Sequence, residues 1–175
     1  MNLTVSIITL VFLVAMSAFF SSSETAFLSL SKIKMRQMLK ENKKAAAPVA
    51  KLKQNTDGLL TLILVGNNFV NTFSSSLATS IVLGLFGQKS VGIATGIMTV
   101  VIIIFGEILP KTFAASSPEK LSLLFAKPLT WLKVLLKPII QIFSVVTKAV
   151  SKFVGLFQKN PLPSVTEEEL KKKLE

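Results

Sequence analysis

The side chains of this chain that could do chemistry are polar residues set inside long apolar runs. They form three clusters: Ser-Ser-Ser-Glu-Thr at 21–25, the asparagines Asn67 and Asn71, and the pair Gly106-Glu107. Hydroxyl, amide and carboxylate oxygens are the ligands that Mg²⁺, Ca²⁺ and alkali ions take in proteins. The sequence has no Cys and no His, which removes the usual ligands of zinc and copper. Any metal chemistry here must therefore use oxygen ligands.

Glu107 lies at the end of a strongly apolar stretch, in Phe-Gly-Glu-Ile-Leu-Pro-Lys at 105–111. An ionised carboxylate inside a bilayer costs about 2.5–3.5 kcal/mol on insertion scales. Pro110 has no N–H to donate to the carbonyl of Gly106, so a main-chain oxygen is free beside the carboxylate. Irregular backbone at this depth is tolerated where it lines a cavity or is buried in protein. The segment predicts an oxygen-lined cation cavity, and the alternative is a buried ion pair of Glu107 with Lys111.

The composition is that of a membrane protein. Of the 175 residues 50% are hydrophobic, and the mean hydropathy is +0.61, which is too apolar for an ordinary soluble domain. The formal net charge is +11, and all but one of the 20 basic residues are lysine. Nucleic-acid readers rely on arginine and aromatic platforms, so the charge argues against a nucleic-acid partner. Lysines beside apolar segments instead indicate control of topology and contact with anionic lipid of the inner leaflet.

The elements that must position the polar clusters are three apolar runs, at 3–30, 59–86 and 91–109. Each is long enough to cross about 30 Å of hydrocarbon. The basic connection at 32–53 is placed in the cytoplasm by the positive-inside rule, so the N-terminus is outside and the C-terminus is cytoplasmic. The prediction is an all-α, multi-pass protein of the cell (inner or plasma) membrane, with a three-span transmembrane domain at 1–115.

The segment after the third span is amphipathic. Its polar residues recur every three or four positions: Lys127, Thr130, Lys133, Lys137, Gln141, Ser144, Lys148 and Ser151. This spacing predicts juxtamembrane helices at 116–160 on the cytoplasmic side, with lysines among the lipid headgroups. Pro128 and Pro138 are expected to divide or kink them. The segment 161–175 combines prolines with a capping box, and we expect it to link to a further cytoplasmic domain.

The three polar clusters are predicted to lie in the same half of the bilayer. At about 1.5 Å of rise per residue, Ser21 lies roughly 15 Å, Asn67 roughly 12 Å and Glu107 roughly 6 Å from the cytoplasmic boundary. Together they predict a hard-cation site. Serines in spans also bond to their own helix, as is expected for 74–76. Structural interpretations remain open for several residues: an ion pair of Glu24 with Lys32 or Lys34, a helix cap at Asp57, and close helix packing at the G-x-x-x-G of Gly92 and Gly96.

The motifs "FFSSSETAFLSLS", "LVGNNFVNT" and "IFGEILPK" resemble the transmembrane domain of the CorC/CNNM magnesium transporters. The resemblance implies a homodimer in which each subunit holds Mg²⁺ in a cavity open to the cytoplasm. It also implies Mg²⁺ export, with Na⁺ as the coupling ion. The tail "VTEEEL" resembles the start of the regulatory region, where relatives carry a tandem CBS module. A nucleotide is therefore expected only through that further domain.

The same resemblance implies a set of metal ligands. They are Ser21 with Ser22 or Ser23 close by, Asn67, Glu107 and the carbonyl of Gly106, with Asn71 lining the site.

Other function classes are less consistent with the sequence. In a non-transporting structural or regulatory membrane protein, the polar clusters would serve dimerisation only. A membrane-lytic protein would need helices that are first soluble, and none has that character. An intramembrane serine hydrolase would need a base, and the chain has no His and no G-x-S-x-G motif. We therefore expect no enzymatic activity.

Overall fold

The computed structural model describes residues 2–138, 141 and 145, which are helical with short connections and contain no strand. Most of the predicted juxtamembrane segment after Pro138 and the predicted linker 161–175 lie outside the described residues. The chain divides into two compact units, Met1–Lys137 and Pro138–Glu175, and every helix named below lies in the first.

Three helical segments are long and apolar enough to cross a membrane: Leu3–Ser29, Thr56–Phe86 and Gln88–Ser116. The first is α1 and the second is α4. The third is built from four consecutive elements: η1 (Gln88–Ser90), α5 (Val91–Val101), the π-helical η2 (Ile102–Ile108) and α6 (Leu109–Ser116). The predicted all-α, three-span fold is confirmed.

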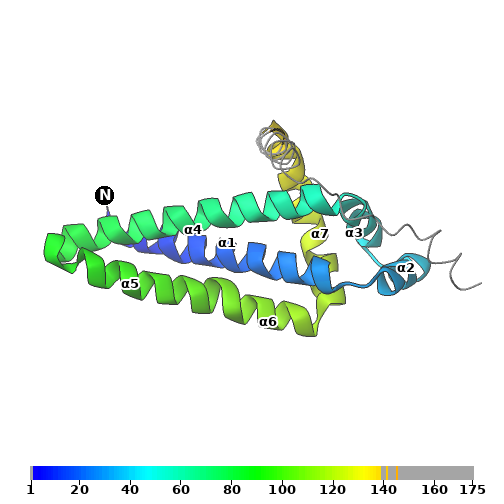
Figure 1. Cartoon of the computed structure of the whole chain (residues 1–175), viewed down its shortest axis with the longest axis horizontal. Helices are drawn as coiled ribbons and strands as arrows, with labels where there is room; N and C mark the ends of the chain where they lie inside the picture. Colours follow the sequence, from blue (N-terminus) through cyan, green and yellow to red (C-terminus); the bar gives the residue numbers. More distant parts are fainter. Residues whose placement is uncertain (1, 139–140, 142–144, 146–175) are drawn as a thin grey trace, which may run out of the picture. The chain divides into compact units, whose positions relative to one another are not determined.

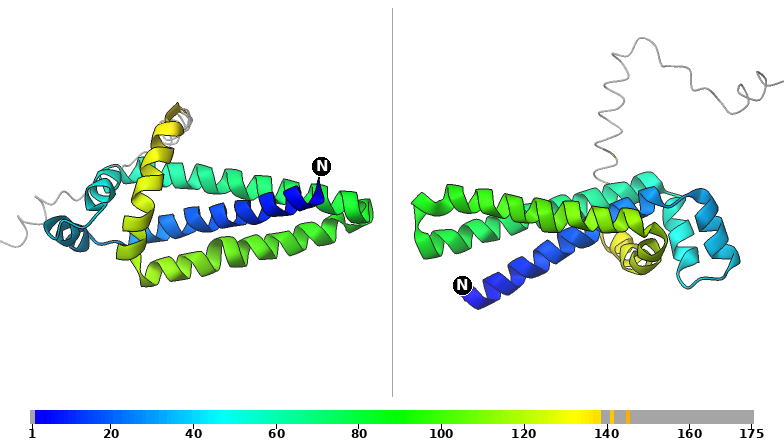
Figure 2. Two further views of the ribbon diagram at one scale, coloured as in Figure 1. Left: turned by 180° about the vertical axis from the view of Figure 1, so that it is seen from behind. Right: turned by 90° about the horizontal axis from the view of Figure 1, so that it is seen from below.

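The second and third spans pack on the first, α1. Helix α1 contacts α4 on one side and η2 and α6 on the other, and α4 contacts α5. Figure 1 shows α2 and α3 at one end of the spans and the α4–α5 connection at the opposite end. We call these the basic end and the hairpin end. In the right-hand view of Figure 2, α1 diverges from α4 and α5 toward its own N-terminus. Helix α1 therefore packs closely on the other two spans toward the basic end and separates from them toward the hairpin end, where α4 and α5 stay side by side (Figure 2).

The basic connection is a pair of short helices, α2 (Lys32–Lys40) and α3 (Ala46–Lys53). Their small core is Met38, Val49 and Leu52, all at most 2% exposed. The ammonium of Lys53 donates to the Leu30 carbonyl at the end of α1, where a cation also complements the helix dipole. Burial lowers the pKa of Lys53, and nearby Lys32 adds to that effect. The connection is thus docked on the bundle.

Side-chain caps set where the helices begin. Asn2 caps α1, Ser31 caps α2 and Asn55 caps α4, the last by accepting from the N–H of Gly58 at 2.9 Å. The prediction that Asp57 caps the second span is wrong, because the helix begins at Thr56 and Asp57 lies within its first turn. At the hairpin end Gly87 ends α4 with a φ of 75°, a conformation that glycine adopts without strain.

The third span is longer than predicted. The apolar run ends at Leu109, but the helix continues to Ser116. Pro110 lies in the first turn of α6, a position that does not need the missing N–H. The close-packing prediction for Gly92 and Gly96 is also not met within the chain, since a Cβ added at either would have no atom within 4 Å.

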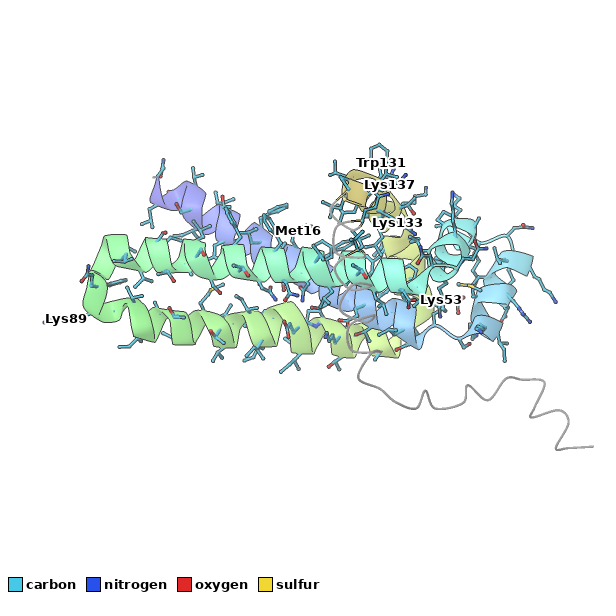
Figure 3. The ribbon with its side chains drawn as sticks, turned by 45° about the horizontal axis from the view of Figure 1, so that its top comes forward. Met16, Lys53, Lys89, Trp131, Lys133 and Lys137 are labelled. Atoms are coloured by element: carbon cyan, nitrogen blue, oxygen red, sulfur yellow. The ribbon has the colours of Figure 1, made fainter. Side chains whose placement is uncertain are left out.

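Helix α7 (Pro118–Leu135) contacts α1, α3, α4 and α6. It buries small residues and one leucine: Ser122, Ala126 and Leu129 are 0% exposed. Trp131, by contrast, is 82% exposed, and Figure 3 shows it with Lys133 and Lys137 on the outer part of the helix. Pro128 does not divide the segment, because α7 continues through it and ends at Leu135, before Pro138; a kink at Pro128 stays a prediction.

Candidate cation site

Ser17 is the residue at which the three spans meet. Its side chain is 0% exposed. Its hydroxyl donates to Oδ1 of Asn67 on α4 at 3.2 Å and lies 3.5 Å from the carbonyl oxygen of Gly106 on η2. One hydroxyl thus joins polar oxygens from the second and third spans.

The close approach of the spans depends on two glycines. A Cβ added at Gly106 would lie 2.7 Å from Ser17 Oγ, and one added at Gly66 would lie 2.4 Å from the ring of Phe20. Phe20 itself is only 3% exposed, so the ring has little freedom to move away. Neither position has room for a methyl group, and any larger residue would separate α1 from its neighbours.

The π-helical turn η2 positions Gly106 and Glu107. The π-helical hydrogen bond is made by the N–H of Leu109, which donates to the carbonyl of Ile104, five residues earlier. Pro110 cannot supply the donor that an α-helix would give to the Gly106 carbonyl. Single π-turns insert one extra residue into a helix and so redirect its side chains. Oε1 of Glu107 accepts from Nδ2 of Asn71 on α4 at 3.2 Å.

Two buried oxygens near these contacts have no hydrogen-bond partner among the described residues. They are Oγ of Ser21 and Oδ1 of Asn71. A carboxylate only accepts hydrogen bonds, so the amide nitrogen of Asn71 faces Glu107 and its oxygen faces elsewhere. A buried polar atom without a partner costs roughly 1–3 kcal/mol, and within a membrane span bulk water does not compensate. These two oxygens are therefore free to bind a ligand.

The neighbouring serines differ from Ser21. The hydroxyl of Ser22 donates to the carbonyl of Pro110 at 3.3 Å, and that of Ser23 donates to the carbonyl of Phe19 in its own helix at 2.7 Å. Ser74 makes the same kind of bond within its helix, to Val70. Of the three serines at 21–23, Ser21 alone lacks a partner among the described residues.

The helix bounds place the polar groups at similar depth. Ser21 lies eight residues before the end of α1, Glu107 nine residues before the end of α6, and Asn67 eleven residues after the start of α4. At about 1.5 Å per residue, these positions are roughly 12, 13 and 16 Å from the basic end of their spans. The sequence-based depth of Glu107 was too shallow because the third span extends to Ser116.

The charges next to the site are paired differently from the sequence-based expectation. Nζ of Lys111 lies 3.1 Å from Oε2 of Glu24. The predicted pairing of Glu24 with Lys32 or Lys34 is therefore wrong. The alternative interpretation of Glu107 as a partner of Lys111 is also not supported, since Lys111 pairs with Glu24 and Glu107 contacts Asn71.

The resulting arrangement offers one carboxylate with hydroxyl, amide and main-chain oxygens. Among the described residues no group of three or more His, Cys, Asp or Glu gathers into a metal-binding cluster. The chemistry fits a hard cation held mainly by neutral oxygens. Sequence reasoning missed Ser17. The available signal was its spacing of four residues before Ser21, which places both on one helix face.

Comparison with known proteins connects this arrangement to a family. The family model for the cyclin M (CNNM) transmembrane N-terminal domain matches residues 7–175. The chain is 38% identical over 140 residues to the UPF0053 inner membrane protein YfjD of Escherichia coli, covering 80% of the chain and 33% of that protein. It is 38% identical over 164 residues to a UPF0053 protein of Haemophilus influenzae, covering 94% of the chain and 39% of that protein.

A plant relative extends the comparison. The chain is 33% identical over 159 residues to the DUF21 domain-containing protein At1g55930, chloroplastic, of Arabidopsis thaliana, covering 91% of the chain and 24% of that protein. The chain thus spans about a quarter to two fifths of the length of these relatives. With three helices apolar enough to span a membrane and a family match over nearly its whole length, this chain is a multi-pass membrane protein that belongs to the CNNM family.

Proposed function

We propose that this chain is the transmembrane part of a Mg²⁺ transporter and that the cation passes through the site between its three spans. The observation that carries the proposal is the pair of buried oxygens, Ser21 Oγ and Asn71 Oδ1, that have no partner among the described residues. Each lies one helical turn from the contact of Ser17 with Asn67: Ser21 toward the basic end, and Asn71, which also donates to the carboxylate of Glu107, toward the hairpin end. A cation beside the carboxylate of Glu107 would neutralise it and give Asn71 Oδ1 a partner, while Ser21 Oγ would meet the cation on its way between the site and the basic end. In a purely structural cluster both oxygens stay unpaired, which is costly.

The proposed ligands come from all three spans. Candidate groups are the hydroxyls of Ser17 and Ser21, the amide oxygens of Asn67 and Asn71, the carbonyl of Gly106 and the carboxylate of Glu107, with Ser22 and Ser23 on the same turn of α1. Mg²⁺ demands six oxygens in near-octahedral geometry and commonly keeps some of its water. A single carboxylate among neutral oxygens holds the ion moderately, which suits a protein that must release it.

The rest of the proposed cycle rests on the family resemblance and on charge. The basic residues of α2, α3 and α7 favour a cytoplasmic location for the basic end, toward which the site would open. Export of Mg²⁺ from the cell, with Na⁺ as the coupling ion, rests on the family resemblance alone. We further propose a homodimer, contact of the α7 lysines with anionic lipid, and nucleotide control only through a further domain.

Calorimetric titration of the detergent-purified chain with Mg²⁺ tests the site. Wild type should bind, and Glu107→Gln should lose binding because it removes the only carboxylate at the site. Asn67→Ala should also weaken binding, while Asn68→Ala is the matched control because Asn68 is exposed. Competition with Na⁺ and Ca²⁺ measures selectivity. Equal binding by wild type and Glu107→Gln, or no binding by wild type, would overturn the proposal.

A further inference from the structure

The ion pair of Glu24 and Lys111 lies directly beside the proposed cation site. Glu24 follows Ser21 by three residues on α1, and Lys111 follows Glu107 by four residues on the third span. Both members are therefore one helical turn from a proposed ligand, toward the basic end. Their side chains are 35% and 42% exposed, and Nζ of Lys111 lies 3.1 Å from Oε2 of Glu24. The pair joins α1 to α6 between the proposed site and the basic end.

Lys111 is positioned to interfere with cation binding. Residues four apart on a helix are neighbours, with Cβ atoms about 5–6 Å apart, and a lysine ammonium is a compact charge on a flexible stem. Swung back by one turn, it could pair with Glu107 and occupy the carboxylate that a divalent cation needs. In the structure it does not do so, because Glu24 holds it.

We propose that Glu24 is a positioning residue that keeps Lys111 away from Glu107, so that the ammonium does not compete with the transported cation. This inference rests on the proposed function. Lys111 is in effect an internal competitor cation, and the equilibrium between its two carboxylate partners sets the fraction of molecules able to bind Mg²⁺. If Lys111 occupied Glu107 for about nine tenths of the time, the apparent affinity would fall about tenfold.

The test is a double-mutant cycle in Mg²⁺ affinity, measured by calorimetry on wild type, Glu24→Gln, Lys111→Gln and the double variant. Glu24→Gln should raise the Kd about tenfold because it releases Lys111. Lys111→Gln should bind at least as tightly as wild type, since the competitor is gone. The double variant should return to within about twofold of wild type. Rescue of one charge deletion by another is the signature of competition.

A merely structural ion pair gives a different pattern. If the pair only joins α1 to α6, then Glu24→Gln and Lys111→Gln weaken binding to the same extent, and the double variant does not recover. That result would overturn the inference while leaving wild-type binding, and so the proposed function, intact. If Glu24→Gln fails to fold, Lys111→Gln alone still tests the proposal, because weaker Mg²⁺ binding by Lys111→Gln than by wild type contradicts it. Absence of binding by wild type would refute the proposed function first.

Discussion

The two ends of the transmembrane unit use small residues in opposite ways. Toward the basic end, Gly66 and Gly106 are in such close contact with α1 that an added Cβ would lie 2.4 and 2.7 Å from its side chains. Toward the hairpin end, a Cβ at Gly84, Gly92 or Gly96 would meet no atom within 4 Å. The same residue type therefore brings helices together in one half and leaves open surface in the other.

The difference extends to what fills the space between helices. Toward the hairpin end, α1, α4 and α5 border an apolar cavity of about 440 Å³, lined by residues such as Leu10, Ala78 and Met98. Toward the basic end, Ser17, Asn67 and Glu107 fill the contact with hydrogen-bonded polar groups. The polar groups lie where the helices pack most closely. Close packing in the half toward the basic end therefore brings their oxygens together. The following experiments test that contrast.

The largest effect on Mg²⁺ binding is expected from Gly106→Ala. The new methyl would clash with Ser17, and overpacking of a buried position costs about 1–3 kcal/mol. We expect a lower thermal unfolding temperature in detergent and loss of Mg²⁺ binding, both measurable on one sample. Gly96→Ala is the matched control from the hairpin half and should change neither. If the two alanine variants behave alike, the contrast between the halves is wrong.

A smaller effect is expected from Ser17→Ala. The change leaves Oδ1 of Asn67 without the bond from α1, at a cost of roughly 1 kcal/mol, and removes one proposed ligand. Mg²⁺ affinity should fall about fivefold to tenfold, the ratio that corresponds to about 1–1.4 kcal/mol. Ser6→Ala is the control, since Ser6 is also buried but bonds only to the carbonyl of Asn2 in the same helix. Equal affinities of the two variants would argue against a role for Ser17.

Glu119 of α7 pairs with Lys34 of α2 and with Lys43 of the α2–α3 connection, and these ion pairs should show a pH-dependent effect. The bond from Lys43 lowers the pKa of Glu119, so the stabilisation is present above the ordinary carboxyl range and is lost as the pH falls through the lowered value. Glu119→Gln should lower the unfolding temperature slightly at neutral pH and low salt, and should match wild type in acid or high salt. A difference that persists in acid would mean that packing, not charge, is responsible.

The smallest effect is expected from Trp131→Ala. The ring is 82% exposed within the chain and packs on little, so the stability in detergent should change by less than about 0.5 kcal/mol. Leu129→Ala, two residues away and fully buried, should cost about 2–5 kcal/mol. Trp131 is the single tryptophan, and quenching of its fluorescence by brominated lipids would place it in the bilayer interface. Unquenched fluorescence would contradict the proposed lipid contact of α7.

Much of the fold could be predicted from the sequence, because the length of an apolar run and the charge of a loop are properties of contiguous segments. The three spans and the basic connection between the first two follow from runs of leucine, isoleucine and lysine, whereas the docking of that connection on the bundle does not. The longer third span was not foreseen, because its apolar run ends at Leu109 and the helix does not. The cap at Asn55 was missed in favour of Asp57, two positions away.

The residues of the candidate site stand out in the sequence, but the contacts between them do not. Asn67, Asn71 and Glu107 stand out as polar groups in apolar runs. Ser17 does not, because a lone serine among apolar residues is ordinary in a membrane span. Its importance comes from contacts with α4 and η2, which no local pattern encodes. The partner of Glu24 was mistaken for the same reason, since Lys32 is near in sequence and Lys111 is near only in space.

The most direct test of the central claim is Mg²⁺ flux across vesicles that contain the purified chain. Vesicles loaded with Mg²⁺ and an internal Mg²⁺-sensitive dye are diluted into Na⁺ buffer, with wild type and Glu107→Gln compared at equal protein content. The account predicts Na⁺-dependent Mg²⁺ loss for wild type and, for Glu107→Gln, only the leak of protein-free vesicles. Equal Mg²⁺ loss by the two proteins would show that the ion does not pass through the site at Glu107.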